Sequence, residues 1–139
     1  MTPLERVTAR VNRNGDVNEP EVPRPLLTLE EFFDGNDVVG SICCNLASAT
    51  PRAVYQVLRD IRSRPEVADV RVQITMFDDP DWPFSDTVWV ITTARPEVVK
   101  SWFPSDVAPD DCQQGWSSGV EFEPLKLRAG TQPIACWWD

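Results

Sequence analysis

The chain has 139 residues and a formal net charge of −9, with 42% hydrophobic and 25% charged residues. These values are those of one ordinary globular domain with a single core, and they exclude a disordered chain. No apolar run approaches the ~18 residues that a membrane span needs. The acidic beginning of the chain fits neither a signal peptide nor a transit peptide. We therefore expect a soluble, cytoplasmic protein that makes no contact with membranes.

Histidine is absent from the sequence. Because histidine is the commonest general base and metal ligand, catalytic triads with a His base and His-type zinc sites are excluded within one chain. The four cysteines, Cys43, Cys44, Cys112 and Cys136, form no Cys-x-x-Cys pair, and we interpret them as reduced, metal-free thiols. No phosphate-binding loop, dinucleotide fingerprint or nucleophile elbow is present. We predict no metal site and no cofactor, assign no catalytic residue, and rank enzymatic activity below binding.

The negative charge is concentrated in the second half of the chain. Residues 1–75 hold nine basic and eleven acidic groups, a balance of −2, whereas residues 76–139 hold four and eleven, a balance of −7. Eleven of the thirteen basic residues are arginine, a bias typical of GC-rich bacterial genomes. Binding to a phosphate backbone requires clustered Lys and Arg, so we expect no direct nucleic-acid binding. The acidic half favours a cationic protein partner, with a solvated face that aids solubility as the alternative.

The first 25 residues predict an irregular N-terminal arm, and residues 26–139 predict a single α+β domain. Pro20, Pro23 and Pro25 disfavour both a helix and a central strand there. A strand or a short helix near the beginning of the arm is the alternative, because apolar residues recur there at helical spacing, namely at Leu4, Val7 and Val11.

Regular structure is predicted to begin with a short helix at Thr28. Thr28 and Glu31 form a capping box, and Leu27 with Phe32 supplies the matching hydrophobic staple. The turn-forming residues 34–37 end this helix. The apolar run Val38 to Leu46 that follows predicts a buried strand.

A second helix is predicted after the N-cap Thr50, with Pro51 at its first position. It ends near Arg64, because cations in the last turn favour the helix dipole. Its apolar residues recur at helical spacing and predict one buried face, made of Ala53, Val54, Val57, Leu58 and Ile61.

Two strands and a third helix follow. Residues 68–77 alternate between apolar and polar side chains, and residues 87–93 are rich in β-branched residues, so each predicts a strand. A helix near Pro96 is expected to bury Val98, Val99, Trp102 and Phe103. The acidic stretch after Pro109 predicts a short helix that ends at Gly115, and residues 132–138 predict a last strand.

The predicted order is strand, helix, strand, strand, helix, strand. This order predicts a ferredoxin-like sandwich (βαββαβ), a four-stranded antiparallel sheet with helices on one face. Trp137 and Trp138 point to opposite faces of the last strand, so one of them lies outside the helix-covered core. That tryptophan is exposed, covered by the arm, or buried in a homodimer.

The connection between residues 78 and 86 combines four carboxylates, two prolines and two aromatics. Rigid aromatics inside a charged rim are typical of interface anchors, so we predict a partner-binding loop. Its residues are Asp78, Asp79, Asp81, Trp82, Phe84 and Asp86. In the competing interpretation, the aromatics cover the core and the aspartates cap turns. A Mg²⁺ or Ca²⁺ site is less favoured, because the EF-hand ligand order is missing.

In size, acidity and single-domain organisation, the chain resembles bacterial immunity proteins of toxin systems. The resemblance implies a small acidic protein-binding module that engages a cationic protein partner. The alternative function is a small-ligand-binding or enzymatic ferredoxin-like domain, since this fold hosts all of these activities.

Overall fold

Four helices and five strands form an α+β fold in the computed structural model, which describes residues 1–139. In chain order they are α1 (Pro3–Val11), β1 (Leu26–Thr28), α2 (Leu29–Phe33), α3 (Pro51–Arg62), β2 (Val67–Gln73), β3 (Thr87–Thr92), α4 (Pro96–Ser101), β4 (Asp111–Gln114) and β5 (Gln132–Trp137).

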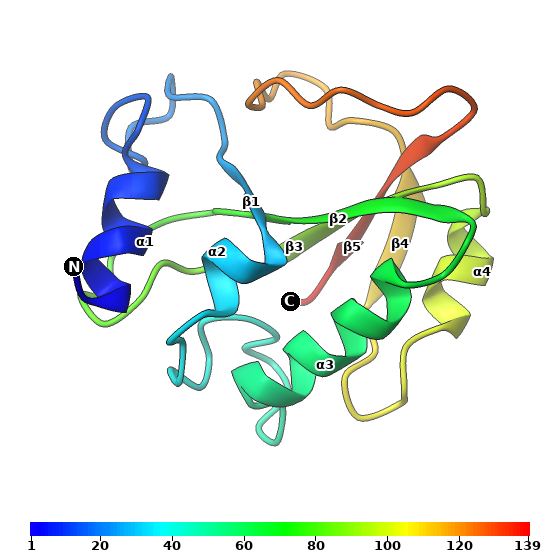
Figure 1. Ribbon diagram of the computed structural model, residues 1–139, viewed down its shortest axis with the longest axis horizontal. Coiled ribbons are helices and arrows are strands. Elements are labelled where there is room, and N and C mark those ends of the chain that lie inside the picture. The colour runs from blue at the N-terminus through cyan, green and yellow to red at the C-terminus, as the bar shows by residue number, and fades with distance from the viewer.

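The strands form one sheet in the order β1-β2-β3-β5-β4, and all neighbouring strands are antiparallel. Helices α2, α3 and α4 pack against one face of this sheet, and α1 packs beside α2 (Figure 1). Residues 115–131, which we call the covering segment, cross the opposite face. No helix in the structure combines the length and apolar character needed to cross a bilayer.

The α+β class and the antiparallel sheet are confirmed, but the predicted count of four strands is wrong. A ferredoxin-like sheet contains two pairs of strands that are each linked by a helix. The two strands of a pair are not neighbours in the sheet, because a strand of the other pair lies between them. Here β3 and β4, joined through α4, flank β5 in this way. In contrast, β1 and β2 are direct neighbours although α2 and α3 connect them. The connectivity therefore does not confirm the ferredoxin-like fold.

The segment from Val38 to Leu46, predicted to be a strand, is a loop of which only residues 41–43 are buried. Gly40 has a φ of 93° and Cys43 a φ of 53°, and neither conformation occurs in an extended strand. The side-chain amide of Asn36 donates to the Ser41 hydroxyl at 3.0 Å and folds the loop on itself. The run is apolar because its middle lies in the core, not because it is extended.

The predicted helix after Pro109 is instead the edge strand β4. Its local sequence suits a helix start, but the segment pairs with β5, with Cys112 opposite Cys136. Tertiary pairing overrides local propensity in this segment. The observed sheet therefore has two strands that were not predicted, β1 and β4, and lacks the one predicted from Val38 to Leu46.

The remaining predicted helices and strands of the core are present, although Val98 of α4, predicted to be buried, is 38% exposed. Thr28 and Glu31 form both capping-box hydrogen bonds, and the Thr50 hydroxyl accepts from the Ala53 N–H at 3.2 Å. Strands β2 and β3 pair along their length. The buried face of α3 consists of Val54, Leu58 and Ile61, whereas Ala53, predicted to be buried with them, is exposed.

The N-terminal 25 residues are irregular only after residue 11. Residues Pro3–Val11 form α1, which Thr2 and Glu5 begin with a second capping box. Its buried residues Val7 and Val11 lie at the helical spacing that the sequence shows. The helical alternative for this segment is therefore confirmed.

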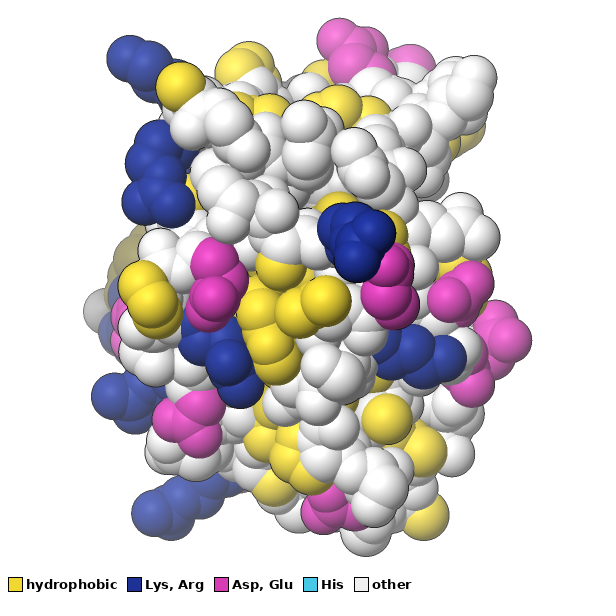
Figure 2. All heavy atoms as spheres, turned by 90° about the vertical axis from the view of Figure 1, so that its right-hand side faces the viewer, with side chains coloured by type: hydrophobic (Ala, Val, Ile, Leu, Met, Phe, Trp, Pro, Cys, Tyr) yellow, Lys and Arg dark blue, Asp and Glu magenta, His cyan; other side chains and the backbone are white.

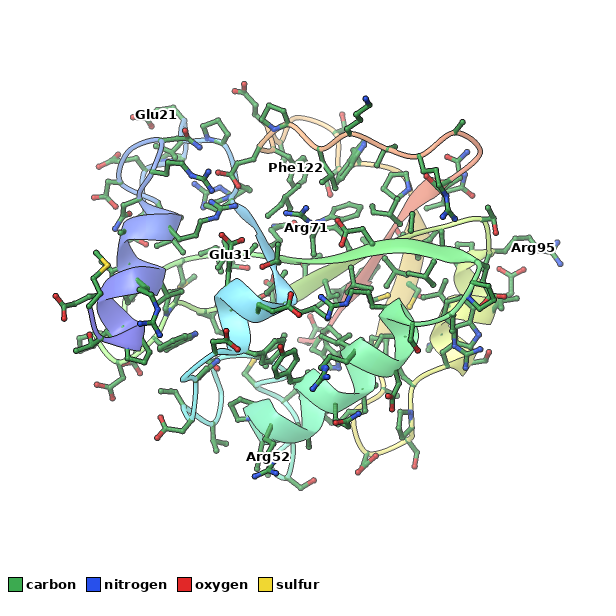
Figure 3. The ribbon with its side chains drawn as sticks, in the orientation of Figure 1. Glu21, Glu31, Arg52, Arg71, Arg95 and Phe122 are labelled. Carbon is green, nitrogen blue, oxygen red and sulfur yellow. The ribbon has the colours of Figure 1, made fainter.

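An ion pair joins α1 to the covering segment. Arg10 binds Glu123 through two hydrogen bonds, at 2.8 and 3.0 Å, and contacts Glu31 of α2 at 3.0 Å. Arg10 and Glu123 are both nearly buried. Burial raises the pKa of Glu123, but hydrogen bonds from Arg10 and the Leu26 N–H lower it further, so the net shift is downward. Figure 3 shows Glu31 on the side of α2 that faces α1.

The sheet separates two cores. The larger one lies between sheet and helices, and a smaller one on the other face contains Trp89 and Ile91. Phe122 of the covering segment packs on the smaller core, on the sheet face where Arg71 lies (Figure 3). Trp138 is buried in the larger core, and Trp137 packs against the smaller one. The predicted division of this pair between two faces is confirmed, and Trp137 is half-buried.

Candidate partner-binding site

The acidic connection between β2 and β3 continues their hairpin. Beyond the ends of the strands, Met76 and Phe84 form an isolated bridge. The Phe84 N–H donates to the Met76 carbonyl at 2.8 Å, and the Thr75 N–H donates to the Phe84 carbonyl at 2.9 Å. Only the tip, residues 77–83, is free of this ladder, so the acidic residues project from a firmly held base.

Trp82, the predicted interface anchor, lies in the main core and is only 3% exposed. Its indole N–H donates to the Phe32 carbonyl of α2 at 3.1 Å. The covering interpretation therefore describes the position of this ring. Phe84 is half-buried.

The predicted aspartates take separate positions. Asp86 accepts from the hydroxyls of Thr75 and Thr87, at 2.7 and 2.9 Å, and so stabilises the base of the hairpin. Asp79 accepts from the Asp81 N–H at 2.8 Å, an Asx turn at the tip. Asp78, Asp79 and Asp81 are exposed, and none of them takes part in an ion pair.

A pocket of about 320 Å³, which we call the loop pocket, lies between this hairpin and the loop after α2. Its wall is mostly apolar, and Val39 is 59% exposed and Met76 39% exposed. Its lining residues are Val38, Val39, Gly40, Ser41, Met76, Asp78, Asp79, Trp82 and Phe84. Four of the six predicted binding residues therefore line one cavity, and Asp81 and Asp86 do not.

Both walls of the loop pocket are fixed by hydrogen bonds. The Ser85 N–H donates to the Ser41 carbonyl at 2.9 Å and joins hairpin to loop. Asn36 and the Ser41 hydroxyl hold the loop from behind. A cavity with such walls needs little reorganisation before binding.

The chemistry of the loop pocket suits binding. Its carboxylates, Asp78 and Asp79, are exposed, whereas catalytic carboxylates are tuned by burial. The nearby loop residue Cys43 is no nucleophile, because burial and the adjacent Cys44 raise its thiol pKa to about 12.

Sequence reasoning missed the loop wall of this pocket. Val38 and Val39 fall within a predicted strand, and Met76 within the predicted buried face of another. The signal that could have identified them is the Gly40-Ser41 pair, because glycine and serine interrupt an apolar run where a turn forms.

A second cavity, which we call the Trp116 cleft, lies over the open end of the smaller core and has a volume of about 500 Å³. Trp116 is 39% exposed and packs against Trp89, with the ring centroids 4.4 Å apart and the ring planes tilted by 43°; both rings contact Phe122. Side-chain amides and hydroxyls surround the exposed indole, from Gln73, Gln113, Gln114, Ser117 and Ser118. Sequence reasoning missed Trp116 as well.

The face on the α4 side has a mixed charge. Figure 2 shows basic and acidic side chains next to one another there, around exposed apolar groups. The excess of acidic residues does not produce a uniformly acidic surface on this side.

Comparisons with known proteins identify relatives along the whole chain. A family model described as "Uncharacterized protein YfbO family" matches residues 2–136. The protein "Uncharacterized protein YfbO" of Escherichia coli (strain K12) is 56% identical over 140 residues, an alignment that covers 100% of both chains. No solved structure matches the chain.

Proposed function

We propose that this chain, which belongs to the YfbO family, is a protein-binding module whose loop pocket takes up an apolar side chain of a cationic partner. The observation that carries the proposal is an apolar cavity rimmed by carboxylates that have no ion-pair partner. The proposal replaces Trp82 as the anchor, because the partner now supplies the anchor and this protein supplies the cavity.

The apolar wall of the loop pocket supports the insertion of a partner side chain into this protein. Val39 and Met76 are two of the six large hydrophobic residues that remain exposed in the structure, and both line the same cavity. Ligand pockets usually measure ~300–1,000 Å³, so a cavity at the lower limit suits one or two side chains. Burying this wall would provide the favourable free energy of binding.

The rim supports a cationic partner. Asp78, Asp79 and Asp81 project beside the cavity without a basic neighbour in an ion pair. Rim charges mainly raise the association rate and select partners, whereas the buried anchor determines the dissociation rate. The preferred ligand is therefore a segment in which Lys or Arg flanks an apolar residue.

The proposed immunity-like role and cytoplasmic location rest on the composition of the chain and on the state of its cysteines. The net charge of −9 and the small size are consistent with an immunity-like role against a basic protein. The four cysteines form no disulfide in the structure, consistent with a reducing compartment such as the cytoplasm.

Selection from a random peptide display library tests the proposal and requires no identified partner. The full chain should enrich peptides in which an apolar residue is flanked by Lys or Arg. Val39→Asp should weaken binding of these peptides at least ~10-fold, because it places a charge in the apolar wall. Val120→Asp changes a similarly exposed valine in the covering segment and serves as the matched control.

A second pair of variants tests the rim. Asp78→Asn with Asp79→Asn should slow association and reduce its salt dependence. Asp106→Asn with Glu121→Gln removes two exposed charges elsewhere and should leave binding nearly unchanged. Failure to enrich such peptides, or equal binding to Val39→Asp and the wild type, would contradict the proposal.

The Trp116 cleft supports a second candidate function, binding of a small neutral polyhydroxylated ligand such as a sugar. An exposed indole can pack against the C–H face of a sugar ring, and the surrounding amides and hydroxyls can bind its hydroxyl groups. Calorimetric titration with a panel of mono- and oligosaccharides tests this candidate. Heat of binding that Trp116→Ala abolishes would support it, and no heat with any sugar would exclude this ligand class.

A further inference from the structure

We propose that Cys112 and Cys136 form a redox-active pair, which a peroxide converts into a disulfide across β4 and β5. This modification site is independent of the loop pocket. It rests on where the two strands place the sulfur atoms.

The pairing register puts the two cysteines directly opposite each other. The Gly115 N–H donates to the Pro133 carbonyl, and hydrogen-bonded pairs alternate along an antiparallel ladder, so Cys112 and Cys136 occupy a non-hydrogen-bonded position. At such positions the Cα atoms are ~4.5 Å apart, inside the ~4.4–6.8 Å range of disulfides. The two Sγ atoms are 3.1 Å apart in the structure.

The burial of the two thiols slows their oxidation but leaves Cys112 accessible to a small oxidant. Cys136 is fully buried, whereas Cys112 lies on the edge strand and is 7% exposed. The hydrogen bond with Cys112 and burial both raise the pKa of Cys136, so the Cys136 thiol stays protonated at neutral pH. Oxidation is therefore slow and begins at the more accessible Cys112.

The proposed reaction consumes one hydrogen peroxide. The Cys112 thiol loses its proton and its sulfur attacks one peroxide oxygen, which breaks the O–O bond and gives a sulfenic acid. The departing hydroxide takes up that proton and leaves as water. The Cys136 sulfur then displaces the sulfenic hydroxyl, which leaves as a second water with the Cys136 proton. Two thiols are oxidised, and the peroxide is reduced to two waters.

The bond would change the protein beyond the two sulfurs. The cysteines lie 24 positions apart, and the covering segment forms most of the intervening chain. The disulfide therefore closes a loop around the cover of the smaller core and fastens the edge strand. Such closure stabilises the folded state chiefly by restricting the unfolded chain.

The other two cysteines provide the background for the test. Cys44 is exposed and Cys43 is its sequence neighbour, and adjacent residues rarely satisfy disulfide geometry. Cys44→Ser removes the exposed thiol that would otherwise react first, and it leaves three cysteines to count.

The experiment treats the full-length Cys44→Ser protein with hydrogen peroxide, removes the peroxide with catalase and alkylates it after denaturation. Mass spectrometry should find one alkylated thiol instead of three, and a cross-linked peptide pair that contains Cys112 and Cys136. The melting temperature should rise by about 5 °C or more and return after reduction with dithiothreitol.

Two variants keep the proposal falsifiable. Cys112→Ala and Cys136→Ala, each in the Cys44→Ser background, should give no intramolecular cross-link and no rise in melting temperature. If the Cys136→Ala protein does not fold, the Cys112→Ala protein, changed at the edge strand, still tests the proposal. Three alkylatable thiols after peroxide treatment, a cross-link through Cys43, or Cys112 oxidised to sulfinic acid without a cross-link would each overturn the proposal.

Discussion

Replacement of Trp82 by alanine tests where the acidic hairpin directs its largest side chain. The ring is 3% exposed and lies in the main core. Removal of a buried Trp typically costs about 3–5 kcal/mol. The indole N–H also satisfies the Phe32 carbonyl, and an unpaired buried carbonyl costs about 1–3 kcal/mol more. We therefore expect a loss of at least about 4 kcal/mol in the free energy of unfolding.

Urea unfolding followed by circular dichroism measures this loss from the transition midpoint at constant slope. Trp82→Phe should lose only about 1–3 kcal/mol, because it keeps most of the apolar volume and lacks the N–H donor. Trp116→Ala removes a half-exposed indole and should lose less than half as much as Trp82→Ala. A loss below about 1.5 kcal/mol for Trp82→Ala would refute the buried position and restore Trp82 as a surface anchor.

Two further predictions concern how α1 and the covering segment dock. Gly119→Ala, in open space, should cost only the ~1–2 kcal/mol of left-handed strain, whereas Gly35→Ala, at a similar φ, should cost well over ~2 kcal/mol because its new Cβ would also lie 2.3 Å from the Pro3 Cβ. Equal losses in urea unfolding would argue against close docking of α1. Because folding lowers the pKa of Glu123, its ionised carboxylate stabilises the folded protein above the pKa of the unfolded chain, near 4.5. This stabilisation is lost as the pH falls through the pKa of Glu123 in the folded protein. Glu123→Gln should therefore lower the free energy of unfolding by about 3 kcal/mol at pH 7, because it leaves the charge of Arg10 poorly compensated. The loss should become progressively smaller below pH 4.5. A loss independent of pH would contradict the ion pair.

The sequence predicts an element well where a local signal and the tertiary structure agree. Helix α3 has a cap at Thr50 and an apolar stripe, and both survive in the structure. The start of the chain shows the opposite case, because three prolines after residue 19 obscured the helical spacing of Leu4, Val7 and Val11. Prolines beyond a helix do not disfavour the helix itself.

The run from Val38 to Leu46 shows why burial alone does not define a strand. Its apolar residues do enter the core, but the backbone at Gly40 and Cys43 is left-handed. A left-handed cysteine is rare and has no sequence signature. Strand β4 could not be predicted either, because its partner lies beyond the covering segment and only the folded chain brings the two together.

The candidate site was only partly predictable for the same reason. The density of carboxylates and aromatics between residues 78 and 86 led the sequence analysis to this hairpin, and four of the predicted residues line the loop pocket. The side to which Trp82 turns depends on its contact with Phe32, which is distant in sequence. The apolar wall comes from the loop after α2, which no local pattern links to the hairpin.

An amide NMR titration of the full chain with a display-selected peptide tests the binding proposal most directly. Binding at the loop pocket predicts shift changes concentrated in residues 38–41 and 76–84, with no comparable changes when Val39→Asp is titrated. Changes centred on the Trp116 cleft, or an undiminished response of Val39→Asp, would contradict binding at the loop pocket.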